Sequence, residues 1–138
     1  MRLFTYFKNL FCREKLEPVK EEDKFVYKQF RQITSALSKK LVSMQNIEYN
    51  ISESFVLSSS DWFARSVALE IRKNTNDEGY GYLILHLLHP HCMCDASTIV
   101  LYGEKASLLE FLNSNEGIEK LIHGARTTDE EMKNWDDQ

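Results

Sequence analysis

The chain has 138 residues, of which 43% are hydrophobic and 28% charged, and its formal net charge is −4 at pH 7. This length suits one domain of average size, whose core can form without disulfides. The composition is close to the globular average, so it excludes a wholly disordered chain, a collagen-like repeat and a polytopic membrane protein.

Charge is distributed unevenly along the chain. Residues 1–45 carry ten Lys or Arg and five Asp or Glu, whereas residues 46–138 carry seven and sixteen, a balance of −9. An acidic body repels phosphate backbones, because nucleic-acid affinity comes largely from Lys and Arg. The same charge attracts basic molecules, although it also serves solubility alone. We therefore expect a basic protein as partner and no nucleic acid.

The three cysteines, Cys12, Cys92 and Cys94, do not form the even, spaced set of a small secreted scaffold. The first eleven residues are apolar but interrupted by polar side chains, and no small-residue cleavage site follows them. No stretch approaches the roughly 20 apolar residues of a membrane span. These features predict a cytoplasmic protein of bacterial type.

Residues 1–18 are predicted to form an amphipathic leader segment. Glu17 and Pro18 end it, because proline disfavours helix in the residue before it. For its helical pattern, within residues 1–16, we favour docking on the domain itself or on a partner, or partial disorder, and contact with anionic lipid is the less favoured alternative. The stripe consists of Leu3, Phe4, Phe7, Leu10 and Phe11, flanked by Arg2, Lys8, Arg13 and Lys15.

Residues 21–45 predict one long amphipathic helix. Acidic residues 21–23 lie where the helix dipole favours anions, and Lys39 and Lys40 lie toward the other end. Apolar residues recur at steps of three and four: Val26, Phe30, Ile33, Leu37, Leu41 and Met44.

Four strands follow, because the hydrophobic period changes to two. The ranges are 47–57, 67–71, 80–88 and 98–102, with a turn at 74–79. The third is apolar on both parities and is predicted to be a central strand covered on both faces. Short connections between neighbours favour an antiparallel meander.

Helical patterns return after the strands, at 106–112 and 118–122, with a stop at Gly124. Thr128 and Glu131 form a capping box that predicts a further helical turn. The fold class is therefore α+β: an N-terminal long helix, a four-stranded antiparallel meander, and C-terminal helices packed on the sheet. We divide the chain into the leader 1–18, a single α+β domain 19–126, and an acidic C-terminal segment 127–138.

One segment is rich in potential metal ligands: residues 86–95 hold three of the four histidines and two of the three cysteines. Zinc and copper favour imidazole and thiolate. However, structural zinc sites pair two separated knuckles, and no second knuckle exists in this sequence. The expected metal is none, and the candidate ligands, should one bind, are His91, Cys92, Cys94 and Asp95.

No catalytic set is evident either. A nucleophilic cysteine needs a base that is itself oriented, and histidines of the same hairpin rarely converge on one. The run Ser58–Asp61 lacks the Gly-x-Ser-x-Gly context of a hydrolase elbow, and the scattered glycines form no phosphate loop. We predict that the protein is not an enzyme and needs no cofactor.

The hypothesis that fits best is a small protein-binding module, an immunity protein that neutralises a basic toxin by covering its active surface. The alternatives are a regulatory module that binds a metal through hairpin 86–95, and a membrane-peripheral interaction protein. Strand parity and charge select the partner-binding candidates, with the aromatic ones as anchors. They are Glu48, Glu53, Asp61, Trp62, Glu70, Asp77, Glu78, Tyr80 and Asp95.

Overall fold

A computed structural model describes residues 24–58, 61–89 and 94–136 of the chain. The leader 1–18 lies outside these ranges, so its predicted contact with lipid or with the domain stays a prediction. In chain order the elements are α2 (Lys24–Val42), β1 (Ile51–Val56), β2 (Ser66–Lys73), β3 (Tyr80–His89), β4 (Cys94–Glu104), α3 (Lys105–Asn113) and α4 (Asn115–Asp136). The predicted α+β fold is confirmed.

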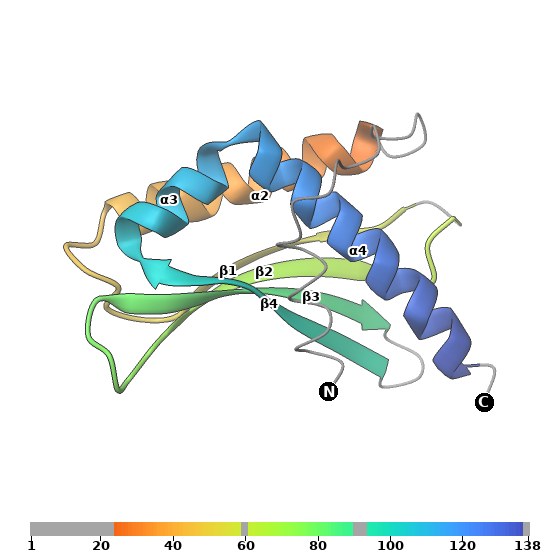
Figure 1. The fold of residues 1–138 in the computed structure, drawn as a ribbon. Helices are drawn as coiled ribbons and strands as arrows, with labels where there is room; N and C mark the ends of the chain where they lie inside the picture. Colours follow the sequence, from red (N-terminus) through yellow and green to blue (C-terminus); the bar gives the residue numbers. More distant parts are fainter. Residues whose placement is uncertain (1–23, 59–60, 90–93, 137–138) are drawn as a thin grey trace.

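The four strands form one antiparallel sheet in the order β1-β2-β3-β4, which is the predicted meander. Helices α2, α3 and α4 of the described ranges lie on the same side of this sheet (Figure 1). We call that side the helix-covered face and the opposite side the outer face. The central place of β3 is therefore confirmed, but the described helices cover only one of its two faces.

Helix α2 buries the apolar stripe that the sequence predicts. Phe30 is fully buried and its ring meets that of Phe55 in β1 edge to face, with 5.2 Å between centroids. Strands β2 and β3 present side chains of one parity to the helices, and these are at most 1% exposed. The layer consists of Val67, Leu69, Ile71, Leu83, Leu85 and Leu87.

The C-terminal helices differ from the prediction in one respect. The expected stop at Gly124 and the capping box at Thr128 are wrong, because α4 continues through both residues. Thr128 Oγ1 donates a hydrogen bond to the carbonyl oxygen of Gly124 at 2.9 Å, which is the back-bond of a residue inside a helix. Continued burial explains the extension, since Thr128, Asp129 and Met132 are all buried. None of the helices in the described ranges is long and apolar enough to cross a membrane.

The two ends of the sheet are tied by different contacts. Between β2 and β3, Gly79 has a φ of 86°, and Asn74 Oδ1 accepts a hydrogen bond from the backbone N–H of Asn76 at 2.9 Å. This confirms the predicted turn at 74–79. At the opposite end, the buried Asp129 carboxylate accepts hydrogen bonds from the backbone N–H groups of Phe63 and Ala64, at 3.1 and 2.8 Å. Helix α4 thereby holds the β1–β2 connection.

Candidate functional site

The outer face carries polar and aromatic side chains as well as Ala68, Ile84, Leu88 and Ile99, whereas the helix-covered face of β2 and β3 is aliphatic. Strand register places Glu70 and Arg72 of β2, Tyr82 and His86 of β3, and Ser97 of β4 on it. A β-bulge changes the register between Leu83 and Ile84 of β3 and their partners in β4. Beyond this bulge, the outer-face positions of β4 are Tyr102 and Glu104.

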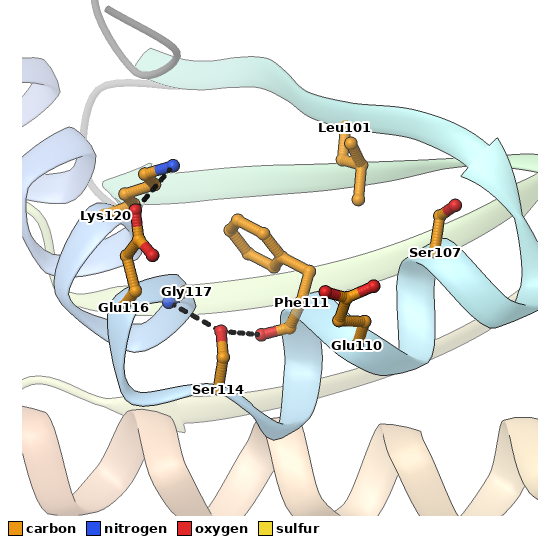
Figure 2. Close-up of a pocket in the computed structure, with 8 residues that line it drawn as sticks. All are labelled: Leu101, Ser107, Glu110, Phe111, Ser114, Glu116, Gly117 and Lys120. Carbon is orange, nitrogen blue, oxygen red and sulfur yellow. Dashed lines mark hydrogen bonds and ion pairs between the residues drawn. The ribbon is translucent and has the colours of Figure 1, made fainter. Parts of the chain in front are cut away.

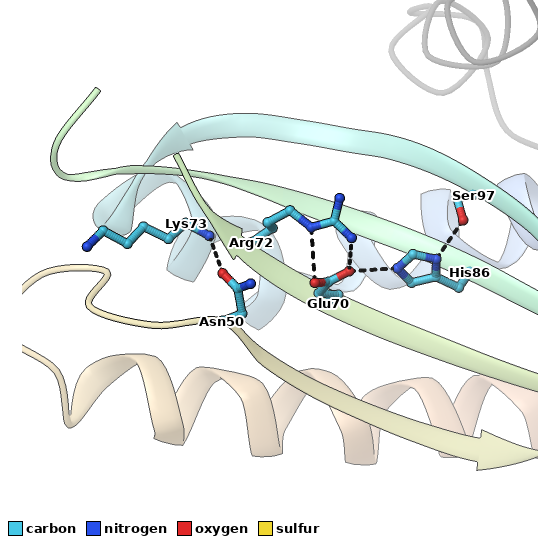
Figure 3. Close-up of polar contacts among 6 residues, drawn as sticks. All are labelled: Asn50, Glu70, Arg72, Lys73, His86 and Ser97. Carbon is cyan, nitrogen blue, oxygen red and sulfur yellow. Dashed lines mark hydrogen bonds and ion pairs between the residues drawn. The ribbon is translucent and has the colours of Figure 1, made fainter. Parts of the chain in front are cut away.

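A polar network crosses three strands in the middle of the outer face (Figure 3). Ser97 Oγ lies 2.7 Å from His86 Nδ1, and His86 Nε2 lies 2.9 Å from Glu70 Oε1. Arg72 donates two hydrogen bonds to the same carboxylate, from Nε to Oε2 at 3.2 Å and from a terminal nitrogen to Oε1 at 2.9 Å. Because a carboxylate only accepts, a neutral His86 donates from Nε2 and accepts the Ser97 proton at Nδ1.

The network also sets the acidity of Glu70. Partial burial raises the pKa of this carboxyl, but hydrogen bonds from Arg72 and His86, with the charge of Arg72, outweigh burial and hold the pKa below its ordinary value. Glu70 is therefore a carboxylate at neutral pH, and its charge is already matched by the guanidinium of Arg72.

The order serine, histidine, carboxylate resembles that of a hydrolytic triad. Acyl transfer needs donors aimed at the oxyanion beside the nucleophile. In a sheet the backbone N–H groups point along the sheet toward neighbouring strands, not out of its face. The backbone around Ser97 therefore supplies no such donors to the outer face, and we interpret the network as a cross-strand polar ladder.

A tyrosine cluster lies at the end of the outer face next to the β2–β3 turn. We use this name for Tyr80, Tyr82 and Tyr102. The rings of Tyr80 and Tyr102 are stacked with centroids 5.4 Å apart, and those of Tyr82 and Tyr102 are tilted with centroids 4.7 Å apart. Tyr102 is 37% exposed although it is a large hydrophobic residue. Tyr80 and Tyr82 are half-buried. A partly exposed aromatic cluster of this kind is typical of recognition surfaces.

Two carboxylates hold the hydroxyl groups of this cluster. Tyr102 donates to Asp77 Oδ2 at 2.7 Å and accepts from Asn74 Nδ2 at 2.9 Å. Tyr80 donates to Glu104 Oε1 at 2.9 Å. These hydrogen bonds to Asp77 and to Glu104 raise the pKa of each phenol, so both keep their protons at neutral pH. The rings are thus fixed in position beside negative charge.

The structure places some of the predicted partner-binding residues at this end of the outer face and others elsewhere. Asp77 and Tyr80 belong to the cluster, and the exposed Glu78 lies in the adjoining turn. Glu70 lies in the polar network of the same face. Asp95 is exposed at the far end of β4, opposite Leu88.

The remaining predicted residues lie off the outer face. Glu53 shares the parity of Phe55 and forms an ion pair of 2.6 Å with Lys40 of α2. Trp62 is only 4% exposed and lies under the guanidinium of Arg126 at 3.9 Å, so its ring is core rather than an exposed anchor. Glu48, in the loop before β1, and Asp61, in the β1–β2 connection, are both exposed.

Five residues of the polar network and the tyrosine cluster with its carboxylates were not among the predicted partner-binding residues: Tyr82, Tyr102, Glu104, His86 and Ser97. Tyr82 has the parity of His86 on β3, so alternation alone could have placed it on the outer face. Tyr102 could not be placed in that way, because Thr98 and Val100 share its parity and are buried. The bulge turns the strand between them.

A hollow with a volume of about 270 Å³ lies between α3, the start of α4 and β4 (Figure 2). Its polar groups are largely engaged with one another. Ser114 Oγ accepts a hydrogen bond from the N–H of Gly117 at 2.9 Å, which caps α4, and Lys120 pairs with Glu116 at 3.3 Å. A pocket whose polar groups are occupied in this way offers a ligand little to recognise.

Within the described ranges, no three His, Cys, Asp or Glu side chains are grouped closely enough to hold a metal ion. His91 and Cys92 lie outside those ranges, and the side chain of Cys94 is not described. The metal candidates His91, Cys92, Cys94 and Asp95 therefore stay a prediction. Comparison of the chain with models of known protein families, with curated proteins and with solved structures finds no match.

Proposed function

We propose that this protein is a small cytosolic binding module that docks a basic protein on the outer face of its sheet, at the tyrosine cluster. The observation that carries the proposal is the contact of two stacked tyrosines, the exposed Tyr102 and the half-buried Tyr80, with the carboxylates of Asp77 and Glu104. Tyrosine supplies large contact area and loses little side-chain entropy on binding, which makes it a frequent anchor of protein interfaces.

Charge selects the kind of partner. The exposed carboxylates at this end are those of Asp77, Glu78 and Glu104. The cations nearby include Lys73, Arg72, which Glu70 already engages, and Lys105, which donates to the carbonyl oxygen of Met44. The sequence from residue 46 onward has a balance of −9. A surface of this sign accelerates encounter with a basic protein and opposes nucleic acid.

The finer proposal is that the module is an immunity protein that neutralises a basic toxin. A toxin that acts on nucleic acid carries its positive charge where the substrate binds. An acidic surface with aromatic anchors would cover that same charge and thereby compete with the substrate. This role requires binding and no chemistry, which agrees with our interpretation of the Ser97, His86 and Glu70 contacts as a structural ladder.

The test is affinity capture from cells that produce the protein, with two variants matched in charge. Asp77→Asn with Glu104→Gln alters the tyrosine cluster, and Glu110→Gln with Glu119→Gln removes the same charge from exposed positions on α3 and α4. We expect wild type and the helix variant to retain a basic protein that elutes as salt rises, and the cluster variant to lose it. Equal capture by both variants, or an acidic captured protein, would contradict the proposal.

The immunity role has its own readout. The captured protein, expressed alone, should arrest growth, and co-expression of wild type should restore it while the cluster variant should not. A captured protein that is harmless when expressed alone would refute the immunity role and leave the binding module in place.

A further inference from the structure

The tyrosine cluster has the composition of a binding site for a single positively charged side chain. Its aromatic faces are electron-rich, and an aromatic face attracts a cation placed over it. The hydroxyl groups of Tyr80 and Tyr102 donate to carboxylates at 2.9 and 2.7 Å, which pushes further electron density into the two rings. A cation is therefore the complementary ligand.

The carboxylates of Asp77 and Glu104 require in addition that the ligand donate hydrogen bonds in a defined direction. Asp77 and Glu104 each accept a tyrosine proton with one oxygen and carry a second oxygen. Both residues are exposed, so a ligand can reach them from solvent. A group that donates two parallel N–H bonds while lying flat on a ring would satisfy aromatic face and carboxylate together.

Arginine has this geometry and lysine does not. The guanidinium is planar, stacks on aromatic rings and pairs with carboxylates as a fork, whereas the ammonium of lysine is a compact and strongly hydrated point charge. The chain already shows the two contacts separately. Arg72 forks onto Glu70, and Arg126 lies over the ring of Trp62 at 3.9 Å.

We propose that the tyrosine cluster, with Asp77 and Glu104, is a recognition site for an arginine side chain of the partner. The inference rests on the proposed function and deepens it, because it identifies the chemical group that the basic protein inserts. It predicts that partner binding depends on one arginine more than on the partner's overall charge.

The test uses three acetylated and amidated tripeptides, Ala-X-Ala, in which X is arginine, lysine or citrulline. Titration into isotope-labelled protein, followed by amide chemical shifts, measures each affinity. We expect shifts confined to the cluster and its turn, about two- to fivefold tighter binding of arginine than of lysine, and no binding of citrulline, which keeps the shape but lacks the charge. Equal affinity for arginine and lysine, or shifts centred elsewhere, would overturn the inference.

Two tyrosine variants supply the matched control. Tyr102→Leu removes a ring of the cluster, whereas Tyr49→Leu removes a ring that is 55% exposed in the loop before β1. Arginine binding should weaken severalfold in the first and stay unchanged in the second. Equal effects of the two would overturn the inference.

The outcome separates this inference from the proposed function. If the peptide does not bind but a basic protein is still captured through the cluster, the arginine site is refuted and the binding module stands. If the peptide binds as expected and no basic protein is captured, the cluster binds arginine, but the proposed function is refuted and with it the assignment of this arginine to a protein partner.

Discussion

The two faces of the sheet differ in burial and in the kind of side chain that they carry. On the helix-covered face, Leu69, Leu83 and Leu85 are at most 1% exposed and pack under α2, α3 and α4. On the outer face, the same strands present a polar ladder and the tyrosine cluster. Because strand side chains alternate in direction, a substitution on one face leaves the other nearly untouched. Stability and recognition should therefore be separable by mutation.

Phe30→Ala should have the largest effect on stability. The side chain is fully buried between α2 and the sheet and contacts the ring of Phe55 edge to face. We expect a loss of about 3–5 kcal/mol in the free energy of unfolding, because the cavity cannot close. Urea denaturation followed by circular dichroism measures it. A loss below about 1 kcal/mol would mean that α2 is not an integral part of the core.

Asp129→Ala should come next. It leaves the backbone N–H groups of Phe63 and Ala64 without the carboxylate that they now share. We expect a loss of about 2–3 kcal/mol, and about half of that for Asp129→Asn, whose single oxygen can still accept. Urea denaturation again gives the values, and faster amide hydrogen exchange at 63 and 64 locates the change. Equal losses for the two variants would show that the hydrogen bonds are not the cause.

Glu70→Gln should have a smaller effect that depends on pH. The folded-state pKa of Glu70 is depressed, so its stabilisation is present above the unfolded-state pKa and is lost as pH falls through the folded-state value. The Arg72 side chain is half exposed, so solvent screens its charge, and we expect wild type to be more stable by about 0.5 kcal/mol at pH 7. This difference should shrink as the pH falls below the ordinary pKa of a glutamate carboxyl.

A double-mutant cycle assigns that difference to a contact. In an Arg72→Gln background the effect of Glu70→Gln at pH 7 should shrink, since the guanidinium that favours the carboxylate is gone. An undiminished effect would attribute the difference to His86 instead.

The sequence predicted the helix-covered face better than the outer face. The apolar stripe of α2 and the alternation of β2 predict burial directly, because apolar side chains are buried away from water when the chain folds. The length of α4 was misjudged because Gly124 is a common stop signal, and tertiary burial of Thr128 and Met132 overrides it.

The tyrosine cluster was predicted only in part, for a geometrical reason. Tyr80 and Asp77 were selected, but the position of Tyr102 depends on a bulge that inserts one residue between Ile99 and Leu101. Without it, alternation would point Tyr102 toward the helices, like Val100. The burial of Trp62, one of the predicted anchors, could not be predicted from local alternation either, because its ring lies against Arg126 of α4, which is distant in sequence.

The most direct test of the account is the footprint of the captured basic protein on this one. Isotope-labelled protein bound to it should show its largest amide shifts and losses of hydrogen exchange at 77–82 and 102–104, with the α2, α3 and α4 signals unchanged. A footprint centred on those helices would contradict the assignment of recognition to the outer face.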